Sequence, residues 1–150
     1  MLDVAEERAA LVVHDIVAAG GQAVSLTCDL TRFDRCEAAA ASLAAAYGGR
    51  IDILVNNAAA FKAPSSTRTH GAFDEWTVEE WDHILGVNLR GMWFMVKAVF
   101  HYMESQGYGK IINVSSSTFW EAPPGLVPYI SSKGGVIGFT RAMARELGSF

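Results

Sequence analysis

Residues Lys110–Glu146, KIINVSSSTFWEAPPGLVPYISSKGGVIGFTRAMARE, decide how the rest of the chain is organised. The apolar, β-branched run Ile111–Val114 predicts a buried strand. Beyond it, the Pro/Gly-rich segment Ala122–Gly125 is typical of a loop, and the apolar pattern of residues 129–147 predicts a helix. A group of serines therefore lies at the end of a strand, and Tyr129 lies at the start of a helix.

Tyr129 and Lys133 are four positions apart, so on a helix they lie one above the other on the same face. An ordinary tyrosine has a pKa of about 10 and is a poor proton acceptor at neutral pH. A lysine ammonium held nearby favours the phenolate, so that the hydroxyl can give a proton to a carbonyl or take one from an alcohol. Ser116 would hydrogen-bond the same oxygen. The same spacing also occurs at the start of ordinary amphipathic helices, and spacing alone does not separate the two interpretations.

Helical and strand patterns alternate along the chain. Helices are predicted from Asp3 to Ala19, from Thr31 to Gly48, from Glu79 to Ser105 and over residues 129–147, and strands over 23–28, 51–55 and 111–114. Motifs that resemble capping boxes open three of the helices, at Asp3, Thr31 and Thr77. This alternation predicts one α/β domain with a doubly wound parallel sheet, in which strand 51–55 is covered on both faces.

In such sheets, ligands bind beyond the carboxyl ends of the strands, where Asp29, Asn57 and Ser116 all lie. The apolar content of 51%, the charged content of 19% and the net charge of −4 are typical of a globular protein without a nucleic-acid surface. The sequence has no apolar run long enough to span a membrane, and neither its cysteines nor its histidines have metal-ligand spacing. We therefore expect a soluble, cytoplasmic protein without a metal site or a membrane partner.

Three motifs together resemble the short-chain dehydrogenase/reductase family: Ser116 with Tyr129 and Lys133, the run Asn56–Ala59, and the run Val87–Gly91. The resemblance covers the whole chain and implies a Rossmann-like sheet and an NAD(P)-dependent oxidoreductase that interconverts a secondary alcohol and a ketone by hydride transfer. It makes Tyr129 the acid/base. Lys133 would tune Tyr129 and bind the nicotinamide ribose, and Ser116 would position the substrate oxygen.

The resemblance also makes Asn88, within Val87–Gly91, a fourth catalytic residue that orients a water in a proton relay to Lys133. From the residues alone, Asn88 lies on the apolar stripe of helix 79–105 and must find a partner there. A hydrogen bond to the backbone of its own helix, with a slight kink, is the simple alternative.

The resemblance further implies a set of cofactor-binding residues. Asp29 with Leu30 would contact the adenine, and Asn57 with Ala58 would lie along the adenosine ribose, although Ala59 stands where the family usually has glycine. Asp3 falls where the family's second strand ends, and a carboxylate there favours NAD over NADP. A helix cap is the alternative role for Asp3. Reduction of ketoacyl carriers and oxidation of an aromatic or cyclic alcohol both remain open, and Phe119-Trp120 slightly favours the latter.

The glycine-rich loop of the family does not occur in this sequence. We therefore expect residues 1–150 to be a partial NAD(P)-binding domain, an internal fragment that lacks the first strand with its glycine-rich loop and the C-terminal strands, the next of which should follow Gly148–Phe150. The alternative function is a catalytically inactive truncated fragment or a non-catalytic nucleotide-binding regulatory protein.

Two further features lie outside these motifs. The segment Ala60–Asp74 is longer than this connection usually is in the family, and it is either a loop that shapes substrate access or a tolerated surface insertion.

Helices 79–105 and 129–147 are apolar on nearly all sides, with Trp93, Phe94, Phe100 and Tyr102 off the main stripe of the first. We expect both helices to form a two-fold interface in a homodimer or homotetramer.

Overall fold

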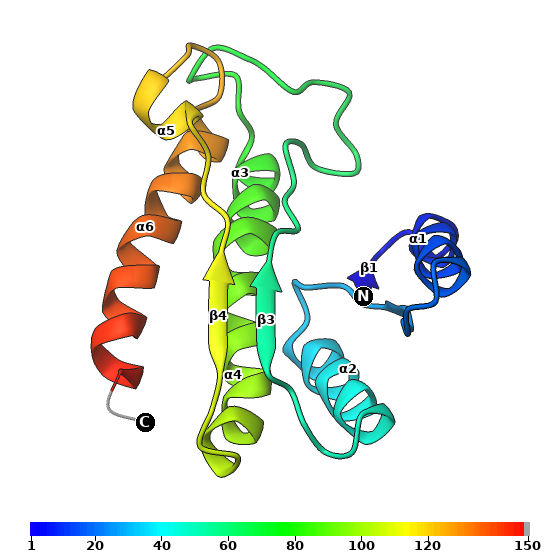
Figure 1. The fold of residues 1–150 in the computed structure, drawn as a ribbon. Helices are drawn as coiled ribbons and strands as arrows, with labels where there is room; N and C mark the ends of the chain where they lie inside the picture. The colour runs from blue at the N-terminus through cyan, green and yellow to red at the C-terminus, as the bar shows by residue number, and fades with distance from the viewer. Residues whose placement is uncertain (149–150) are drawn as a thin grey trace.

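A computed structural model describes residues 1–148, so Ser149 and Phe150, where we expected a further strand to follow, lie outside the described residues. Strands and helices alternate as the sequence predicts (Figure 1). Their bounds are β1 Leu2–Asp3, α1 Glu6–Ala18, β2 Leu26–Thr27, α2 Phe33–Ala46, β3 Ile53–Asn56, α3 Val78–Leu85, the π-helical turn η1 Gly86–Arg90, α4 Gly91–Ser105, β4 Lys110–Asn113, α5 Thr118–Glu121 and α6 Val127–Leu147.

The strands form two parallel pairs instead of one continuous sheet. β1 pairs with β2, with Leu2 opposite Leu26, and β3 pairs with β4, with Val55 opposite Ile112. Between the pairs lies a groove of about 800 Å³, lined by β1 on one side and β3 on the other. The fold is thus an incomplete α/β domain with parallel strands, as the sequence predicts.

A ladder of polar side chains crosses β3, β4 and α6. The Asn56 amide donates to Asn113 Oδ1 at 2.9 Å, and the Asn113 amide donates to Thr140 Oγ1 at 3.0 Å. Thr140 in turn donates to the backbone oxygen of Val136, one turn earlier on α6. Because these groups are half-buried or buried, the ladder supplies the partners that they need and sets the position of α6 against the strands.

Small side chains bring α2 close to α4 and build the main core between them. The buried residues of this core are Cys28, Cys36, Ala39, Ala40, Met95, Ala98, Val99 and Met103. Burial raises the pKa of the Cys36 thiol to about 12, and it also raises the pKa of Cys28. Both thiols therefore serve as small apolar side chains of the core.

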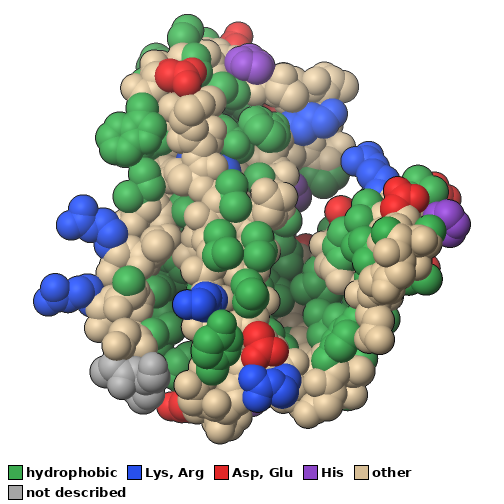
Figure 2. Space-filling view, viewed as in Figure 1, with side chains coloured by type: hydrophobic (Ala, Val, Ile, Leu, Met, Phe, Trp, Pro, Cys, Tyr) green, Lys and Arg blue, Asp and Glu red, His purple; other side chains and the backbone are tan. Residues whose placement is uncertain are grey.

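One face of the β3–β4 pair is open, which corrects the expectation that strand 51–55 is covered on both faces. α4 packs behind the pair, whereas Ile53 and Val55 on the other face are each 55% exposed. Hydrophobic side chains gather over the two strands in the view of Figure 2. The apolar run 51–55 does form a strand, β3, but within residues 1–148 only one of its faces is covered.

Two of the three predicted capping boxes are wrong. Asp3 belongs to β1, where its carboxylate accepts from the Ala5 backbone N–H at 2.8 Å, and α1 begins only after Ala5. The Thr31 hydroxyl donates to Asp29, and α2 begins after Arg32 without a side-chain cap. The box at Thr77 is confirmed, because Thr77 and Glu80 bind each other's backbone N–H.

Within residues 1–148, no helix is both long enough and apolar enough to cross a membrane.

Candidate active site

α6 holds Tyr129 and Lys133 one turn apart, and both side chains are buried at 6% and 2% exposure. The Lys133 ammonium donates to the backbone oxygen of Val114 at 2.8 Å, just beyond the end of β4. The same nitrogen lies 5.7 Å from the centroid of the Tyr129 ring. Burial lowers the pKa of Lys133. The sequence-predicted pair is therefore assembled, and Lys133 ties it to the carboxyl end of the strand.

Ser116 lies in the loop between β4 and α5. Its Oγ accepts from the Thr118 hydroxyl at 2.8 Å and from the Thr118 N–H at 3.3 Å. In both contacts Ser116 is the acceptor, so its hydroxyl can still donate a hydrogen bond to an oxygen of a bound substrate. The neighbouring Ser115 donates to the Lys133 backbone oxygen at 2.8 Å, which fixes this loop against α6.

Asn88 is buried in η1, the π-helical turn between α3 and α4. Its Oδ1 accepts from the Ala60 N–H at 2.6 Å, and its amide donates to the Ala60 oxygen at 2.9 Å and to Ser132 Oγ at 3.0 Å. Because Asn88 reaches the loop after β3 and α6, the alternative in which it bonds to its own helix is wrong. π-Turns of this kind are frequent at functional sites.

Gly91 shows why the motif Val87–Gly91 ends in a residue without a side chain. A Cβ atom at this position would lie 2.9 Å from the backbone oxygen of Leu30, which is closer than real Cβ contacts. The glycine lets the start of α4 pack directly on the loop after β2. This contact brings the Leu30 loop and the Asn88 turn together.

Phe61 is the site residue that the sequence did not reveal. Its ring stacks on the ring of Tyr129, with centroids 4.1 Å apart and planes 17° apart. Phe119 packs edge-on against Trp120 and lies so close to Gly134 that a Cβ there would clash with its ring. The only sequence signal for Phe61 is an aromatic residue shortly after Asn57, and such a residue alone predicts no stacking partner.

The predicted cofactor residues divide into two groups. Asp3, Leu30, Asn57 and Ala58 all line the groove between β1 and β3, whereas Asp29, Tyr129 and Lys133 do not. The Asp29 carboxylate accepts from the Thr31 N–H at 2.9 Å and from its hydroxyl at 2.8 Å, and these bonds lower the pKa of Asp29. The Asp29 side chain is thus engaged within its own loop. The other four residues share the lining of one groove.

Comparison with known proteins gives the same family for the whole chain. The family model described as short chain dehydrogenase matches residues 1–150. The chain is 36% identical over 148 residues to the probable galactose dehydrogenase of Rhizobium meliloti, covering 98% of this chain and 55% of that protein. It is 34% identical over 146 residues to the (2S)-[(R)-hydroxy(phenyl)methyl]succinyl-CoA dehydrogenase subunit BbsD of Thauera aromatica, covering 97% of this chain and 55% of that protein.

Solved structures agree with this result. A crystal structure of NAD⁺-bound xylitol dehydrogenase matches with a TM-score of 0.89 and 28% identity, covering 99% of this chain and 54% of that one. A metagenomic short-chain oxidoreductase in complex with NADP matches with a TM-score of 0.86 and 34% identity, covering 99% and 64%. The chain spans about half the length of the curated relatives it matches. On these matches and its assembled motifs, the chain belongs to the short chain dehydrogenase family.

Proposed function

We propose that the complete protein is an NAD(P)-dependent oxidoreductase that interconverts a secondary alcohol and a ketone, with Tyr129 as the acid/base. The observation that carries the proposal is the buried pair on α6, in which the Lys133 nitrogen lies 5.7 Å from the Tyr129 ring centroid and is anchored to Val114. A nicotinamide cofactor would supply or accept the hydride, and Tyr129 would exchange the accompanying proton with the substrate oxygen.

The other residues have supporting roles in this proposal. Ser116 donates its proton to the substrate oxygen and so holds that oxygen near Tyr129. Lys133 tunes Tyr129 and binds the nicotinamide ribose. Asn88, which joins α6 to the loop after β3 through Ser132 and Ala60, positions the water of the proton relay. Family membership supports these roles, since the four residues occur in the family's order.

Four residues of the groove between β1 and β3 would hold the adenosine part of the cofactor. Asp3 and Leu30 lie on one wall, and Asn57 with Ala58 lies at the end of β3. We place Asp29 with them through its backbone, because its carboxylate is already bound to Thr31. We also propose that a further strand of the complete, single-domain enzyme fills the rest of this groove, since the chain spans about half the length of its relatives.

For the substrate, we favour an aromatic or cyclic alcohol over a ketoacyl carrier. The Phe61 ring stacks on Tyr129, and Phe119 packs against α6 and against Trp120, which is 77% exposed. The relatives' names include a sugar dehydrogenase and a dehydrogenase of a phenyl-bearing thioester, so both ring-bearing and thioester substrates occur among them. We expect a cytoplasmic enzyme with no nucleic-acid or membrane partner.

The proposal is tested by assaying the complete protein with cyclohexanol or a hydroxyacyl thioester in the presence of NAD or NADP. We expect the ultraviolet absorbance of the reduced cofactor to increase with time only when the alcohol is present. Residues 1–150 alone serve as the comparison, and we expect little or no turnover from them. Cofactor binding by the complete protein without turnover of any alcohol would instead support the nucleotide-binding regulatory alternative.

A further inference from the structure

The loop between β3 and α3 is fixed at its start by Asn88. This side chain binds both the N–H and the oxygen of Ala60, at 2.6 and 2.9 Å, as a neighbouring strand would. Asn88 is itself buried in η1 and bound to Ser132 on α6. The backbone position of Ala60 is therefore set by two other elements. Phe61 is the next residue, so the fixed backbone of Ala60 also restricts where the Phe61 side chain can lie.

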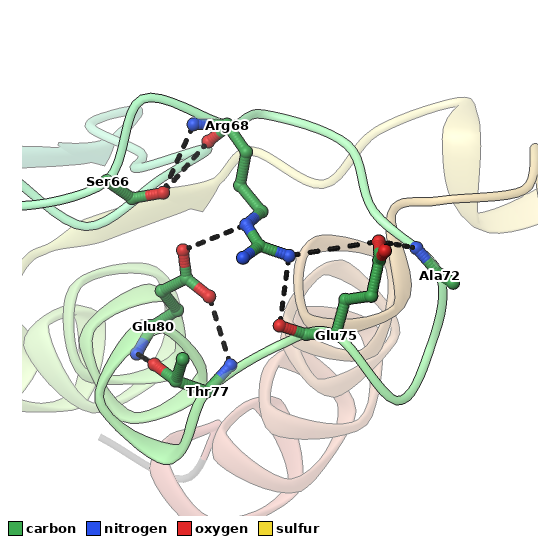
Figure 3. A network of polar contacts seen from close by, with 6 residues as sticks. All are labelled: Ser66, Arg68, Ala72, Glu75, Thr77 and Glu80. Atoms are coloured by element: carbon green, nitrogen blue, oxygen red, sulfur yellow. Dashed lines mark hydrogen bonds and ion pairs between the residues drawn. The ribbon is translucent and has the colours of Figure 1, made fainter.

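The middle of the loop is held by Arg68 (Figure 3). Its guanidinium donates to the backbone oxygen of Glu75 at 2.9 Å and lies 3.4 Å from the Glu80 carboxylate. Glu80 is buried and also accepts from the Thr77 N–H at 3.0 Å, at the start of α3. Ser66 accepts from the Arg68 N–H at 3.1 Å. Arg68 therefore joins the loop to the first turn of α3 through a carboxylate that is shielded from solvent.

The far part of the loop reaches the connection between α5 and α6. The Gly71 N–H donates to the Gly125 oxygen at 3.1 Å, and Glu75 accepts from the Ala72 N–H at 2.9 Å. Gly125 has a φ of 87°, a left-handed conformation that favours glycine. In Figure 1 the loop runs across the top of the molecule toward this connection, which leads directly into Tyr129. The two loops thus meet at the start of α6.

Phe61 is the point at which this loop meets the proposed acid/base. Its ring stacks on Tyr129 at 4.1 Å with nearly parallel planes, while Tyr129 itself is buried. A parallel ring at this distance limits the rotation and sideways movement of the phenol. Catalysis by a single hydroxyl is sensitive to such movement, because misplacement by about 1 Å costs on the order of a hundredfold in rate.

We propose that Phe61 is a positioning residue for Tyr129, held in place by the Asn88–Ala60 bonds and the Arg68–Glu80 contact. This inference rests on the proposed function, in which Tyr129 exchanges the proton. It gives the long loop a role at the site, whereas a tolerated surface insertion needs no contact with the acid/base. Phe61 acts through Tyr129 and needs no contact with the reacting atoms.

The test compares Phe61→Leu, Phe61→Tyr and Phe73→Leu in the complete protein, with cyclohexanol and NAD. Phe73 is the matched control, because it lies on the same loop and is 79% exposed. We expect Phe61→Leu to lower kcat and kcat/KM together by about tenfold or more, because the loss is one of transition-state geometry. Phe61→Tyr keeps the stacked ring and should restore both constants, and Phe73→Leu should leave them unchanged.

A second measurement needs no turnover. In NMR spectra of the complete protein with ring-labelled tyrosine, the Tyr129 signal is identified by its loss in Tyr129→Phe. We expect Phe61→Leu to move this signal and Phe73→Leu to leave it in place. An unmoved signal, or a rise in KM with unchanged kcat, would overturn the proposal. If Tyr129→Phe retained turnover, the proposed function would fail instead, and the NMR result would still decide the stacking.

Discussion

At the scale of single residues, the site is built from buried polar groups that have found fixed partners. Lys133 uses the Val114 oxygen, and Asn88 uses Ala60 and Ser132. An unpaired buried ammonium or amide would cost several kcal/mol, so these partners also determine where the side chains point. The i, i+4 spacing was enough to predict that Tyr129 and Lys133 lie together, because both belong to one helix. The Phe61 stack joins distant parts of the chain, and no local pattern encodes it.

The prediction that the protein prefers NAD to NADP rests on Asp3. It ends β1 and lines the groove, and one carboxylate oxygen accepts from the Ala5 N–H at 2.8 Å. A carboxylate there would bind a ribose hydroxyl and repel a phosphate. We expect the complete protein to have a higher kcat/KM with NAD than with NADP, and Asp3→Ser to reduce that ratio by about tenfold, ~1.4 kcal/mol. Asp15→Ser, an exposed change on α1, is the control. A clear NADP preference of the wild-type protein would contradict the prediction.

At the scale of elements, the sequence predicted the kinds of helices and strands well and their ends less well. Helix 129–147 corresponds to α6, and the helix ending at Ser105 is present. The π-turn inside it was not predicted, because the contacts of Asn88 with Ala60 and Ser132 are tertiary. The capping boxes at Asp3 and Thr31 failed because Asp3 stays in a strand and Thr31 bonds to Asp29.

Glu80 provides a pH-dependent test of the loop anchor. The Ser66 hydroxyl, the Thr77 N–H and Arg68 hold the pKa of Glu80 below its ordinary value. Because the folded protein binds this proton less readily than the unfolded chain, the stabilisation is present above about pH 4.3 and is lost as the pH falls further. We expect Glu80→Gln to lower the unfolding temperature of the complete protein at neutral pH, and the difference from wild type to shrink in acid.

The control for this experiment is Glu79→Gln, an exposed carboxylate in the same first turn of α3. It should change the unfolding temperature little at any pH. A difference between wild type and Glu80→Gln that stays constant from neutral to acidic pH would show that the charge of Glu80 does not hold the loop.

At the scale of the whole molecule, fewer aromatic side chains of α4 are exposed than the sequence pattern predicts. Phe94 and Tyr102 pack against the core shared with α2, and Phe94 also contacts Phe33. Trp93 remains 45% exposed, beside a hollow of about 620 Å³ lined also by Leu89 and Phe139. On α4 and α6, the apolar surface available for a partner therefore centres on Trp93 and Phe139, beside η1.

We predict that the complete protein is a dimer or tetramer through this surface, because an exposed tryptophan beside an apolar hollow is typical of an interface. Trp93→Glu should shift the protein toward smaller species in sedimentation at micromolar concentration. Trp120→Glu, which changes a more exposed ring on α5, should not. A monomeric wild-type protein would mean that the rest of the complete chain covers this surface.

The central claim, that Tyr129 is the acid/base, is tested most directly by the single-turnover rate of the complete protein with bound NAD and cyclohexanol. Tyr129→Phe removes only the hydroxyl from a ring that is already held by Phe61, so the fold and cofactor affinity should remain. Tyr108→Phe, at a half-exposed tyrosine, is the matched control and should turn over normally. We predict that Tyr129→Phe loses nearly all of the rate. If it keeps more than about a tenth of the wild-type rate, a loss of only ~1.4 kcal/mol, the acid/base role is contradicted.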